Sequence, residues 1–404
     1  MKRIFAVIFM LLLAVITVTP CFAAGELEVS NPEYYNRPEL RGTTINVFNW
    51  GLYISDTDDG EGMIDVNKEF EKLTGIKVNY TTFASNEDMY AKLKSGGTSY
   101  DVIIPSDYMI QKLISEDMVK KIDYKSLPNF KNIAEEYTSM YFDPNNEYCV
   151  AYSVGFVGLI YNTSVVEEAP TSWSVLWDER YAGKILMFDN YRDAFAVAQQ
   201  LLGISINTTD EAELRNAADK LLSQKPLLQS YVMDETYNKM ETGEAALAPY
   251  YAGDFVCMQE VNPDLEFVYP EEGVNIFVDA ACIPNSSQNT AAAELYINFL
   301  LEPKVALANA LCIGYATPNE AVLELEEYAD MAENEYLYPD EKPKSEYFHS
   351  LSTETLDVMS DLWNEVKTSG ENIMSVYIGL SATAVLVVVF YIAQKIKKKK
   401  RDIY

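Results

Sequence analysis

The sequence predicts an α/β protein whose first part is built on a parallel sheet. The chain has 404 residues, of which 49% are apolar and 23% charged, a composition typical of globular proteins. At roughly 150 residues per domain, this length allows two or three domains. Strand-like and helix-like segments alternate over residues 44–114, and this β-α-β-α-β order is typical of parallel strands joined by right-handed crossovers.

The first series of elements follows from spacing and capping residues. Apolar residues at helical spacing end at Gly75, which suits a C-cap, and Ser85 with Asp88 three residues later predicts the next helix start. A third helix face begins at Met109. The expected strands cover residues 44–48, 76–83 and 101–104.

A second series of strands and helices begins after Tyr148. Gly203 ends one expected helix, Thr208 with Glu211 opens another, and Pro303 suits the first turn of a third. The expected strands are 150–161, 184–188, 245–249, 267–269 and 275–278, and the expected helices include 191–202, 290–301, 303–311 and 353–368.

Both ends of the chain carry membrane-related signals. Residues 1–24 have a basic start, an apolar run and small residues at the end, which predicts a secretory signal peptide. Cys21 offers a lipoprotein alternative, although Pro20 before it fits poorly. Residues 373–393 are uncharged and long enough for a membrane span, and the basic tail 394–404 predicts a cytoplasmic end. Residues 25–42 are expected to form an extended, polar linker.

Charge and histidine content exclude several functions. The net charge is −30, and a nucleic-acid binder needs a basic face instead. An acidic surface attracts small cations, or simply keeps a protein soluble. With His349 as the single histidine, a Ser-His-Asp triad or a His-based zinc site is not expected.

Four cysteines follow the signal segment, at positions 149, 257, 282 and 312. Their spacings match no metal knuckle, so we expect no metal site from them. The sequence leaves open whether one disulfide forms or all four remain buried thiols.

Aromatic and acidic residues recur after the expected strands. Ligands of open α/β sheets lie beyond the carboxyl ends of the strands. Aromatic faces attract a cation, and carboxylates pair with ammonium groups, so this combination suits an organic cation. The residues at these ends include Trp50, Tyr53, Ser106, Tyr108, Asp189, Asn190, Asp193, Tyr251, Asp254, Phe277 and Asp279.

Each of these residues also has a purely structural interpretation. Trp50 could anchor the core, Tyr53 and Tyr108 could be surface tyrosines, and Asp193 could stabilise a helix start. Asp279 is harder to explain in this way, because it interrupts an apolar stretch and a lone buried acid needs a partner.

Several long segments in order resemble spermidine/putrescine-binding proteins of ABC importers. They include VFNWGLYIS, TSWSVLWDERYAGKILMFDN, NIFVDAACIP and IGYATPN, and the resemblance covers about residues 43–366. It implies a two-lobed fold of the type II periplasmic-binding-protein class that closes at a hinge. The implied divisions are lobe one (43–150), lobe two (151–273), a return to lobe one (274–330) and an acidic C-terminal segment with a helix (331–372).

The resemblance implies a ligand site and no catalytic residue, metal or cofactor. Its expected residues are Trp50, Tyr53, Ser106, Tyr108, Asn190, Asp193, Tyr251, Asp254, Phe277, Asp279, Tyr315 and Asn364. Methylenes would stack on Trp50, Tyr251 and Phe277, while Asp254 and Asp279 would hold one ammonium group and Asp193 the other. The implied partners are a polyamine, ABC permease subunits and, through the C-terminal helix, the membrane.

Three departures from the family pattern bear on the ligand. Leu52 and Asn190 stand where polyamine binders often carry acids, and Tyr251 replaces a tryptophan. Fewer acids favour putrescine slightly over spermidine. The alternatives are another cationic solute bound by the same fold, a membrane-tethered hydrolase with paired carboxylates, and a sensor that acts through another membrane protein.

Overall fold

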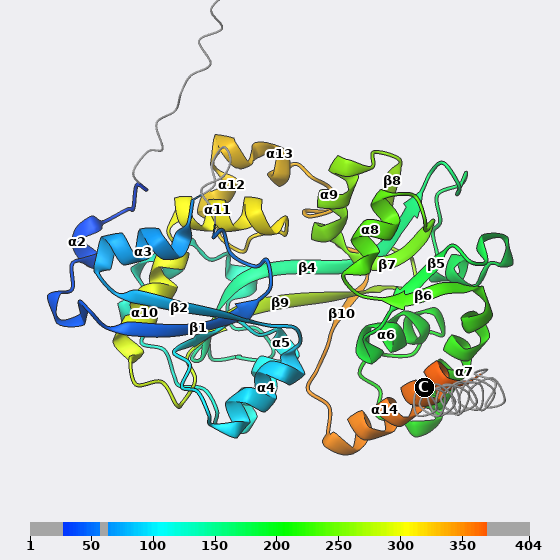
Figure 1. Ribbon diagram of the computed structural model, residues 1–404, viewed down its shortest axis with the longest axis horizontal. Helices are drawn as coiled ribbons and strands as arrows, with labels where there is room; N and C mark the ends of the chain where they lie inside the picture. The colour runs from blue at the N-terminus through cyan, green and yellow to red at the C-terminus, as the bar shows by residue number, and fades with distance from the viewer. Residues whose placement is uncertain (1–26, 57–63, 370–404) are drawn as a thin grey trace, which may run out of the picture.

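The strands form one continuous mixed sheet that runs through two lobes. The computed structural model describes residues 27–56 and 64–369. Its strand order is β2-β1-β3-β9-β4-β7-β5-β6, with β10 beside β9 and β8 beside β4. Figure 1 shows lobe one in blue, cyan and yellow, and lobe two in green, with β4 and β9 running between them.

Lobe one begins with the expected alternation. Strand β1 (Thr44–Trp50) pairs in parallel with β2 (Lys77–Phe83) and β3 (Val102–Ile103). Gly75 ends the first connecting helix at φ 74°, and the Ser85 side chain accepts a hydrogen bond from the backbone N–H of Asp88. These caps were expected from the sequence. The three helices are α3 (Val66–Thr74), α4 (Asn86–Ser95) and α5 (Asp107–Ser115).

Two long strands connect the lobes. The first half of β4 (Cys149–Asn162) pairs with β9 (Val274–Cys282), and its second half pairs with β7 (Leu247–Tyr251) and β8 (Leu265–Val268). All these pairings, and that of β3 with β9, are antiparallel. The sheet is therefore mixed, because the chain returns through β9 against the direction of β3.

Lobe two completes the sheet with β5 (Ile185–Phe188), which pairs in parallel with β6 (Leu228–Val232) and β7. Strand β6 was not expected from the sequence. The helices of this lobe are α6 (Tyr191–Leu201), α7 (Glu211–Gln224), α8 (Glu235–Glu241) and α9 (Ala252–Val261).

The chain then returns to lobe one and ends on lobe two. Helices α10 (Thr290–Leu300) and α11 (Pro303–Ile313) are largely buried in lobe one. The short α12 (Glu320–Leu323) and α13 (Ala329–Ala332) precede β10 (Ser345–Tyr347), which pairs with β9. Helix α14 (Thr353–Thr368) then packs beside α7, as Figure 1 shows in orange.

The segment before β1 differs from the expected extended linker. It contains the helix α2 (Pro32–Tyr35) and a 3-10 turn at Pro38–Leu40. Tyr35 is fully buried, and its hydroxyl donates to the Glu302 carboxylate at 2.6 Å. A buried contact between residues so far apart in the chain fixes this segment, and no local pattern indicates it.

The predicted signal peptide (1–24), membrane anchor (373–393) and basic tail (394–404) lie outside the described residues. Within residues 27–56 and 64–369, no single helix is long and apolar enough to cross a membrane. Helices α10 and α11 meet these criteria only together, and they are bent by 73° where they join.

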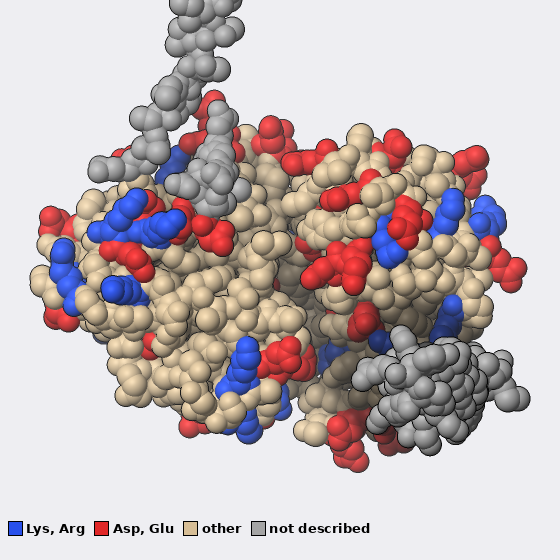
Figure 2. Space-filling model, viewed as in Figure 1, with Lys and Arg blue, Asp and Glu red and all other residues tan. Residues whose placement is uncertain are grey.

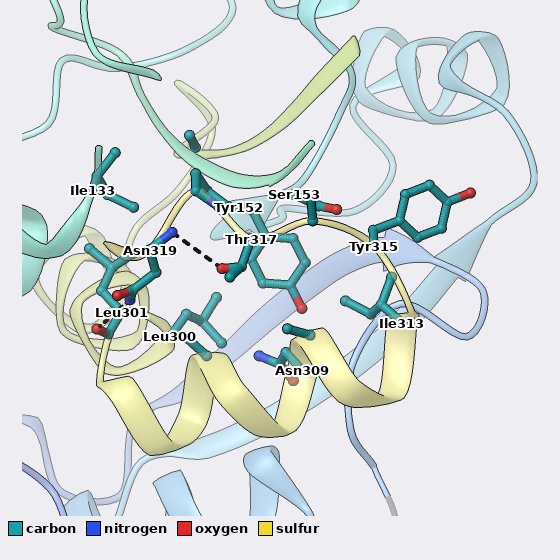
Figure 3. A pocket seen from close by; sticks show the side chains of 15 residues that line it. Ile133, Tyr152, Ser153, Leu300, Leu301, Asn309, Ile313, Tyr315, Thr317 and Asn319 are labelled. Carbon is teal, nitrogen blue, oxygen red and sulfur yellow. Dashed lines mark hydrogen bonds between the residues drawn. The ribbon is translucent and has the colours of Figure 1, made fainter. Parts of the chain in front are cut away.

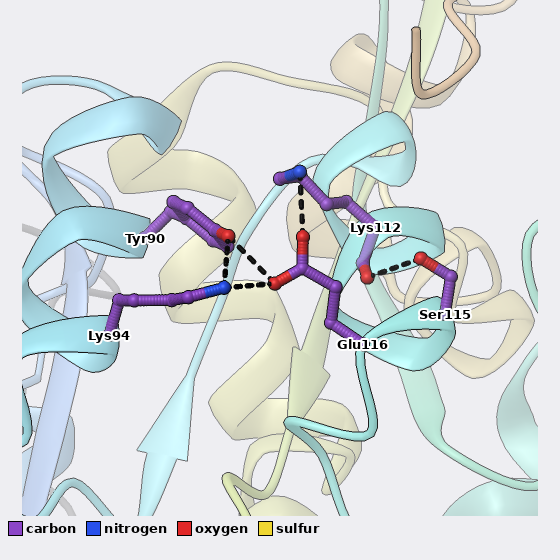
Figure 4. Close-up of polar contacts among 5 residues, drawn as sticks. All are labelled: Tyr90, Lys94, Lys112, Ser115 and Glu116. Carbon is purple, nitrogen blue, oxygen red and sulfur yellow. Dashed lines mark hydrogen bonds and ion pairs between the residues drawn. The ribbon is translucent and has the colours of Figure 1, made fainter. Parts of the chain in front are cut away.

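A polar network joins α4 to the end of α5 (Figure 4). The Glu116 carboxylate accepts hydrogen bonds from Lys94 and Tyr90, both at 2.7 Å, and forms an ion pair with Lys112 at 2.8 Å. Hydrogen bonds from Lys112, Lys94 and Tyr90 lower the pKa of Glu116 to about 2. Because the charged side chains of this network are partly exposed, the network contributes only modestly to stability. It fixes the end of α5, and the first turn of this helix carries Tyr108.

Candidate functional site

A small cluster of mostly aromatic side chains lies where the two lobes meet, separate from the main core. We call it the junction cluster. Strand β1 and the turn after it supply two of its members, β4 and β9 supply one each, and one lies at the end of β7 in lobe two. The members are Trp50, Tyr53, Tyr152, Tyr251, Phe277, Ile313 and Tyr315.

The rings of the junction cluster contact one another across the lobes. Tyr251 of lobe two lies 5.7 Å from Phe277, measured between ring centroids, and Phe277 lies 5.9 Å from Tyr315. Tyr315 in turn lies 6.0 Å from Tyr53. Each pair lies in the edge-on arrangement that aromatic rings favour. A ligand that stacks on these faces therefore has to part them.

Two glycines make room for these rings. A Cβ atom on Gly155 of β4 would lie 2.3 Å from the Phe277 ring, and one on Gly253 of α9 would lie 2.6 Å from the Tyr315 ring. Any side chain at either position would displace a ring. The two glycines therefore allow the Phe277 and Tyr315 rings to approach the backbone closely.

Three carboxylates surround the cluster, and each accepts a hydrogen bond from one of its tyrosines. The Tyr53 hydroxyl donates to Asp279 at 2.6 Å, and the Tyr251 hydroxyl donates to Asp193 at 3.2 Å. Asp254 accepts from Tyr315 at 2.5 Å. The site thus presents acids beside aromatic faces, as a cation-binding site requires.

Burial makes these carboxylates costly to ionise. It raises the pKa of Asp193, Asp254 and Asp279 to about 6 each. Tyrosine hydroxyls oppose the shift in all three. An ammonium group that pairs with them would compensate the cost, because an opposite charge favours the ionised form.

Asp279 has a carboxylate oxygen with no partner in the described part of the chain. The side chain is only 4% exposed, and its Oδ1 atom is buried without a hydrogen bond, while Oδ2 accepts from Tyr53. The indole N–H of Trp50 is likewise buried without an acceptor among the described residues. A buried oxygen that lacks a donor is costly in a folded protein and marks a position for a ligand donor.

A small cavity lies behind the cluster, between β4 and α11 (Figure 3). Tyr152, Ser153, Asn309 and Tyr315 are among the side chains that line it. Its volume of about 20 Å³ is enough for one water molecule and too small for a diamine. This cavity is therefore not where a diamine could lie.

Tyr108 lies in a second contact between the lobes. Its hydroxyl donates to Glu87 at 3.0 Å and accepts from Asn86 at 3.1 Å. The guanidinium of Arg192, on α6 of lobe two, lies 5.7 Å from the Tyr108 ring and 4.4 Å from the Phe348 ring. We call Tyr108, Arg192 and Phe348 the latch. Tyr108 is thus engaged in the latch and not in the junction cluster.

Arg192 is unusual because it is a buried cation. It is 4% exposed, and the described residues give it no carboxylate ion pair and no partner for its Nε–H. Its Nη2 atom donates to the His349 carbonyl at 3.4 Å. Burial lowers its pKa, the nearby charges of Asp193 and Glu87 oppose this shift, and the two aromatic faces lie within cation–π distance of the guanidinium.

The remaining expected residues lie elsewhere. Ser106 forms a β-bridge with Asp279, beside the cluster. The Asn190 side chain caps α6 by accepting from the N–H of Arg192, and Asn364 is exposed on α14. Leu52, where the family pattern often has an acid, is 94% exposed with φ at 52°, so it does not line the cluster.

Sequence reasoning overlooked Tyr152, Tyr237 and Arg192. Tyr152 donates to the Tyr53 carbonyl at 2.8 Å, and Tyr237 donates to Asp254 at 2.5 Å. Tyr152 stands within a mostly apolar stretch of the sequence, a signal that could have been used. Tyr237 lies on a polar helix, and nothing in the sequence near it indicates its role.

Acidic side chains spread over both lobes in the space-filling view. Figure 2 shows them in red on either side, with a hollow between the lobes in the middle of this face. This distribution agrees with the net charge of −30. Such a field raises the local concentration of small cations and favours their entry.

Comparisons with known proteins agree with this geometry. Residues 98–335 match the family model described as bacterial extracellular solute-binding protein. A spermidine/putrescine-binding periplasmic protein of Salmonella typhimurium is 37% identical over 74% of this chain and 83% of that protein. A putrescine-binding periplasmic protein of Pseudomonas aeruginosa is 27% identical over 80% of this chain and 92% of that protein.

The solved structures give the same result. A structure from Listeria monocytogenes, described as a spermidine/putrescine ABC transporter, has a TM-score of 0.75 and 35% sequence identity. The match covers 80% of this chain and 99% of that one.

Proposed function

Because this chain belongs to the family of bacterial extracellular solute-binding proteins, we propose that it captures a linear polyamine for a membrane permease of an ABC importer. The function is binding without chemistry, and the polyamine is released unchanged. The lobe divisions expected from the sequence (43–150, 151–273 and 274–330) describe the two bodies that close on the ligand.

The unpartnered oxygen of Asp279 is the observation that carries this proposal. It is buried inside β9, and Tyr53 of the junction cluster donates to the other oxygen of the same carboxylate. An ammonium group supplies the missing donor and also the opposite charge. A neutral solute would supply at most a hydrogen bond, and an anion would be repelled.

The proposed binding mode uses the three carboxylates beside the junction cluster. Asp279 and Asp254 hold one ammonium group, and Asp193 holds the other. The methylene chain stacks on Trp50, Tyr251 and Phe277. The tyrosine hydroxyls that now donate to the carboxylates keep these side chains oriented while the ligand enters.

The ligand preference is putrescine over spermidine. Leu52 and Asn190 are uncharged, so neither provides a carboxylate for a further ammonium group. Leu52 is also exposed, and the Asn190 side chain is used to cap a helix. Titration calorimetry with putrescine, spermidine and spermine tests the order, with putrescine expected to bind tightest. Tighter binding of spermidine would overturn this preference, and recovery of cleaved polyamine would instead favour the hydrolase alternative.

Replacing Arg192 with Ala is expected to weaken polyamine binding by roughly threefold to thirtyfold, because the closed form loses a cation–π contact between the lobes. The dissociation rate, measured by stopped-flow fluorescence, should rise by a similar factor. Arg180→Ala is the matched control, since Arg180 is exposed and pairs locally with Asp178. Equal dissociation rates for the two variants would contradict a role of the latch in closure.

We propose further that residues 373–393 anchor the protein, with the tail 394–404 in the cytoplasm. The support is the uncharged stretch and the basic cluster that follows it. The full chain should sediment with membranes and resist extraction at high salt, whereas a chain that ends at residue 371 should be released. Release of the full chain by salt would contradict the anchor.

A further inference from the structure

Cys149 and Cys282 lie opposite each other on the two strands that connect the lobes. They are direct partners in the antiparallel register of β4 and β9. Such partners have Cα atoms about 4.5–5.5 Å apart, within the span of about 4.4–6.8 Å that a disulfide bridges. The Cys282 side chain is also close enough to form a hydrogen bond with the Cys149 thiol.

Both thiols are inaccessible in the folded protein. Cys149 is 6% exposed and Cys282 is 0% exposed, and both are free thiols in this structure. The hydrogen bond with Cys282 and burial raise the pKa of Cys149 well above its usual value. A thiol of this kind reacts slowly once the protein has folded.

The surroundings tolerate a bond between the two sulfur atoms. The Cys149 thiol contacts the Asp143 carboxylate at 3.5 Å, but that carboxylate also accepts backbone N–H groups from Glu147, Tyr148 and Cys149. Loss of the thiol proton therefore leaves Asp143 satisfied. Apart from its contact with Cys149, the Cys282 thiol makes a weak 3.8 Å contact with the Ala280 carbonyl.

The other two cysteines have no such arrangement. Cys257 lies on α9 of lobe two and Cys312 on α11 of lobe one, and they are not partners in a strand register. The Cys312 thiol instead lies 3.5 Å from the Ile54 carbonyl. Of the three pairing schemes that four cysteines allow, the structure favours the one that contains Cys149–Cys282.

We propose that Cys149 and Cys282 form a disulfide when the chain folds in the presence of a small-molecule disulfide oxidant. One cysteine thiolate attacks the oxidant and forms a mixed disulfide, which releases one thiol. The second thiolate then attacks the cysteine sulfur of the mixed disulfide and releases the second thiol. The pair gives up two protons and two electrons, and the oxidant is reduced to two thiols.

The bond would close a loop that contains the whole of lobe two. Cys149 opens β4 and Cys282 ends β9, so the chain leaves lobe one and returns to it between these two residues. The cross-link lies at the lobe-one end of both strands. We therefore expect it to stabilise the folded state by restricting the unfolded chain, while hinge closure and ligand affinity stay unchanged.

The test refolds the full chain with oxidised glutathione, blocks remaining thiols under denaturing conditions and maps the peptides by mass spectrometry. The expected product has a Cys149–Cys282 peptide lighter by two hydrogen atoms, and Cys257 and Cys312 blocked. Relative to the reduced protein, its Tm should be higher by roughly 5 °C or more. Blocked thiols at both Cys149 and Cys282, or a bond from either of them to another cysteine, would overturn the proposal.

Variants separate this bond from other effects. Cys257→Ser should retain the bond and the Tm increase on oxidation, whereas Cys282→Ser should lose both. If Cys282→Ser does not fold, peptide mapping of the unsubstituted protein still shows whether the Cys149–Cys282 bond forms. The proposal does not depend on the ligand, so failure of polyamine binding would leave it unaffected.

Discussion

Asp279→Asn is expected to weaken polyamine binding by at least about tenfold, which corresponds to about 1.4 kcal/mol or more. The substitution preserves shape but removes the negative charge that pairs with the ammonium group. The ligand nitrogen would then keep Asp254 as its only carboxylate partner in a buried site, and the lost charge pairing costs more than a neutral hydrogen bond. Calorimetric titration of the variant measures the effect.

Asp143→Asn provides the matched control for this prediction. Asp143 is as buried as Asp279, but its carboxylate accepts three backbone N–H groups in lobe one, away from the junction cluster. The control should lose stability and keep its ligand affinity. An unchanged Kd for Asp279→Asn would refute the assigned role of Asp279.

The second large effect is a dependence of affinity on pH. Asp193, Asp254 and Asp279 have pKa values raised by burial to about 6. Ammonium groups of the ligand remain charged from pH 5 to 8, so the protein carboxyls control the change. At pH 5 a carboxyl with pKa 6 is about one-tenth ionised, and affinity should fall about tenfold, relative to pH 8, for each carboxyl that must ionise.

In the ligand-free protein, stability changes with pH in the direction opposite to affinity. Between about pH 4 and pH 6 the folded state binds more protons than the unfolded state, because its carboxyl pKa values are raised. The free energy of unfolding therefore falls as pH rises through this window. A polyamine reverses this loss, since it stabilises the ionised carboxylates.

Calorimetry at pH 5, 6, 7 and 8, in two buffers that differ in ionisation enthalpy, measures both the affinity and the protons released on binding. We expect proton release at pH 5 and none at pH 8. Asp279→Asn should release about one proton fewer at pH 5. A constant Kd with no proton release across this range would contradict the account.

Local patterns were sufficient for most of the individual elements. The caps at Gly75 and Ser85 define helix boundaries by backbone geometry, and Pro303 begins α11 as its spacing indicates. The pairing of strands was not a local property. The mixed direction of the sheet arises because β9 returns from lobe two, and α2 is fixed by the contact of Tyr35 with Glu302.

The junction cluster was predictable where its residues follow strands. Tyr53 and Tyr251 were expected at such ends and lie there, whereas Phe277 joins the same junction cluster from inside β9, which is longer than the expected strand. Tyr108 also follows a strand, but its ring faces Arg192. Which of two neighbouring clusters a residue joins depends on how the lobes meet, and a single sequence does not contain that information.

The central claim is that the junction cluster recognises paired ammonium groups, and one comparison tests it most directly. Putrescine and 1,4-butanediol share a four-carbon chain and differ in their charged ends. Titrated by calorimetry at pH 8, putrescine should bind with a Kd below about 10 μM, and butanediol should not bind measurably. Equal binding of the two, or binding of neither by the folded protein, would contradict the claim.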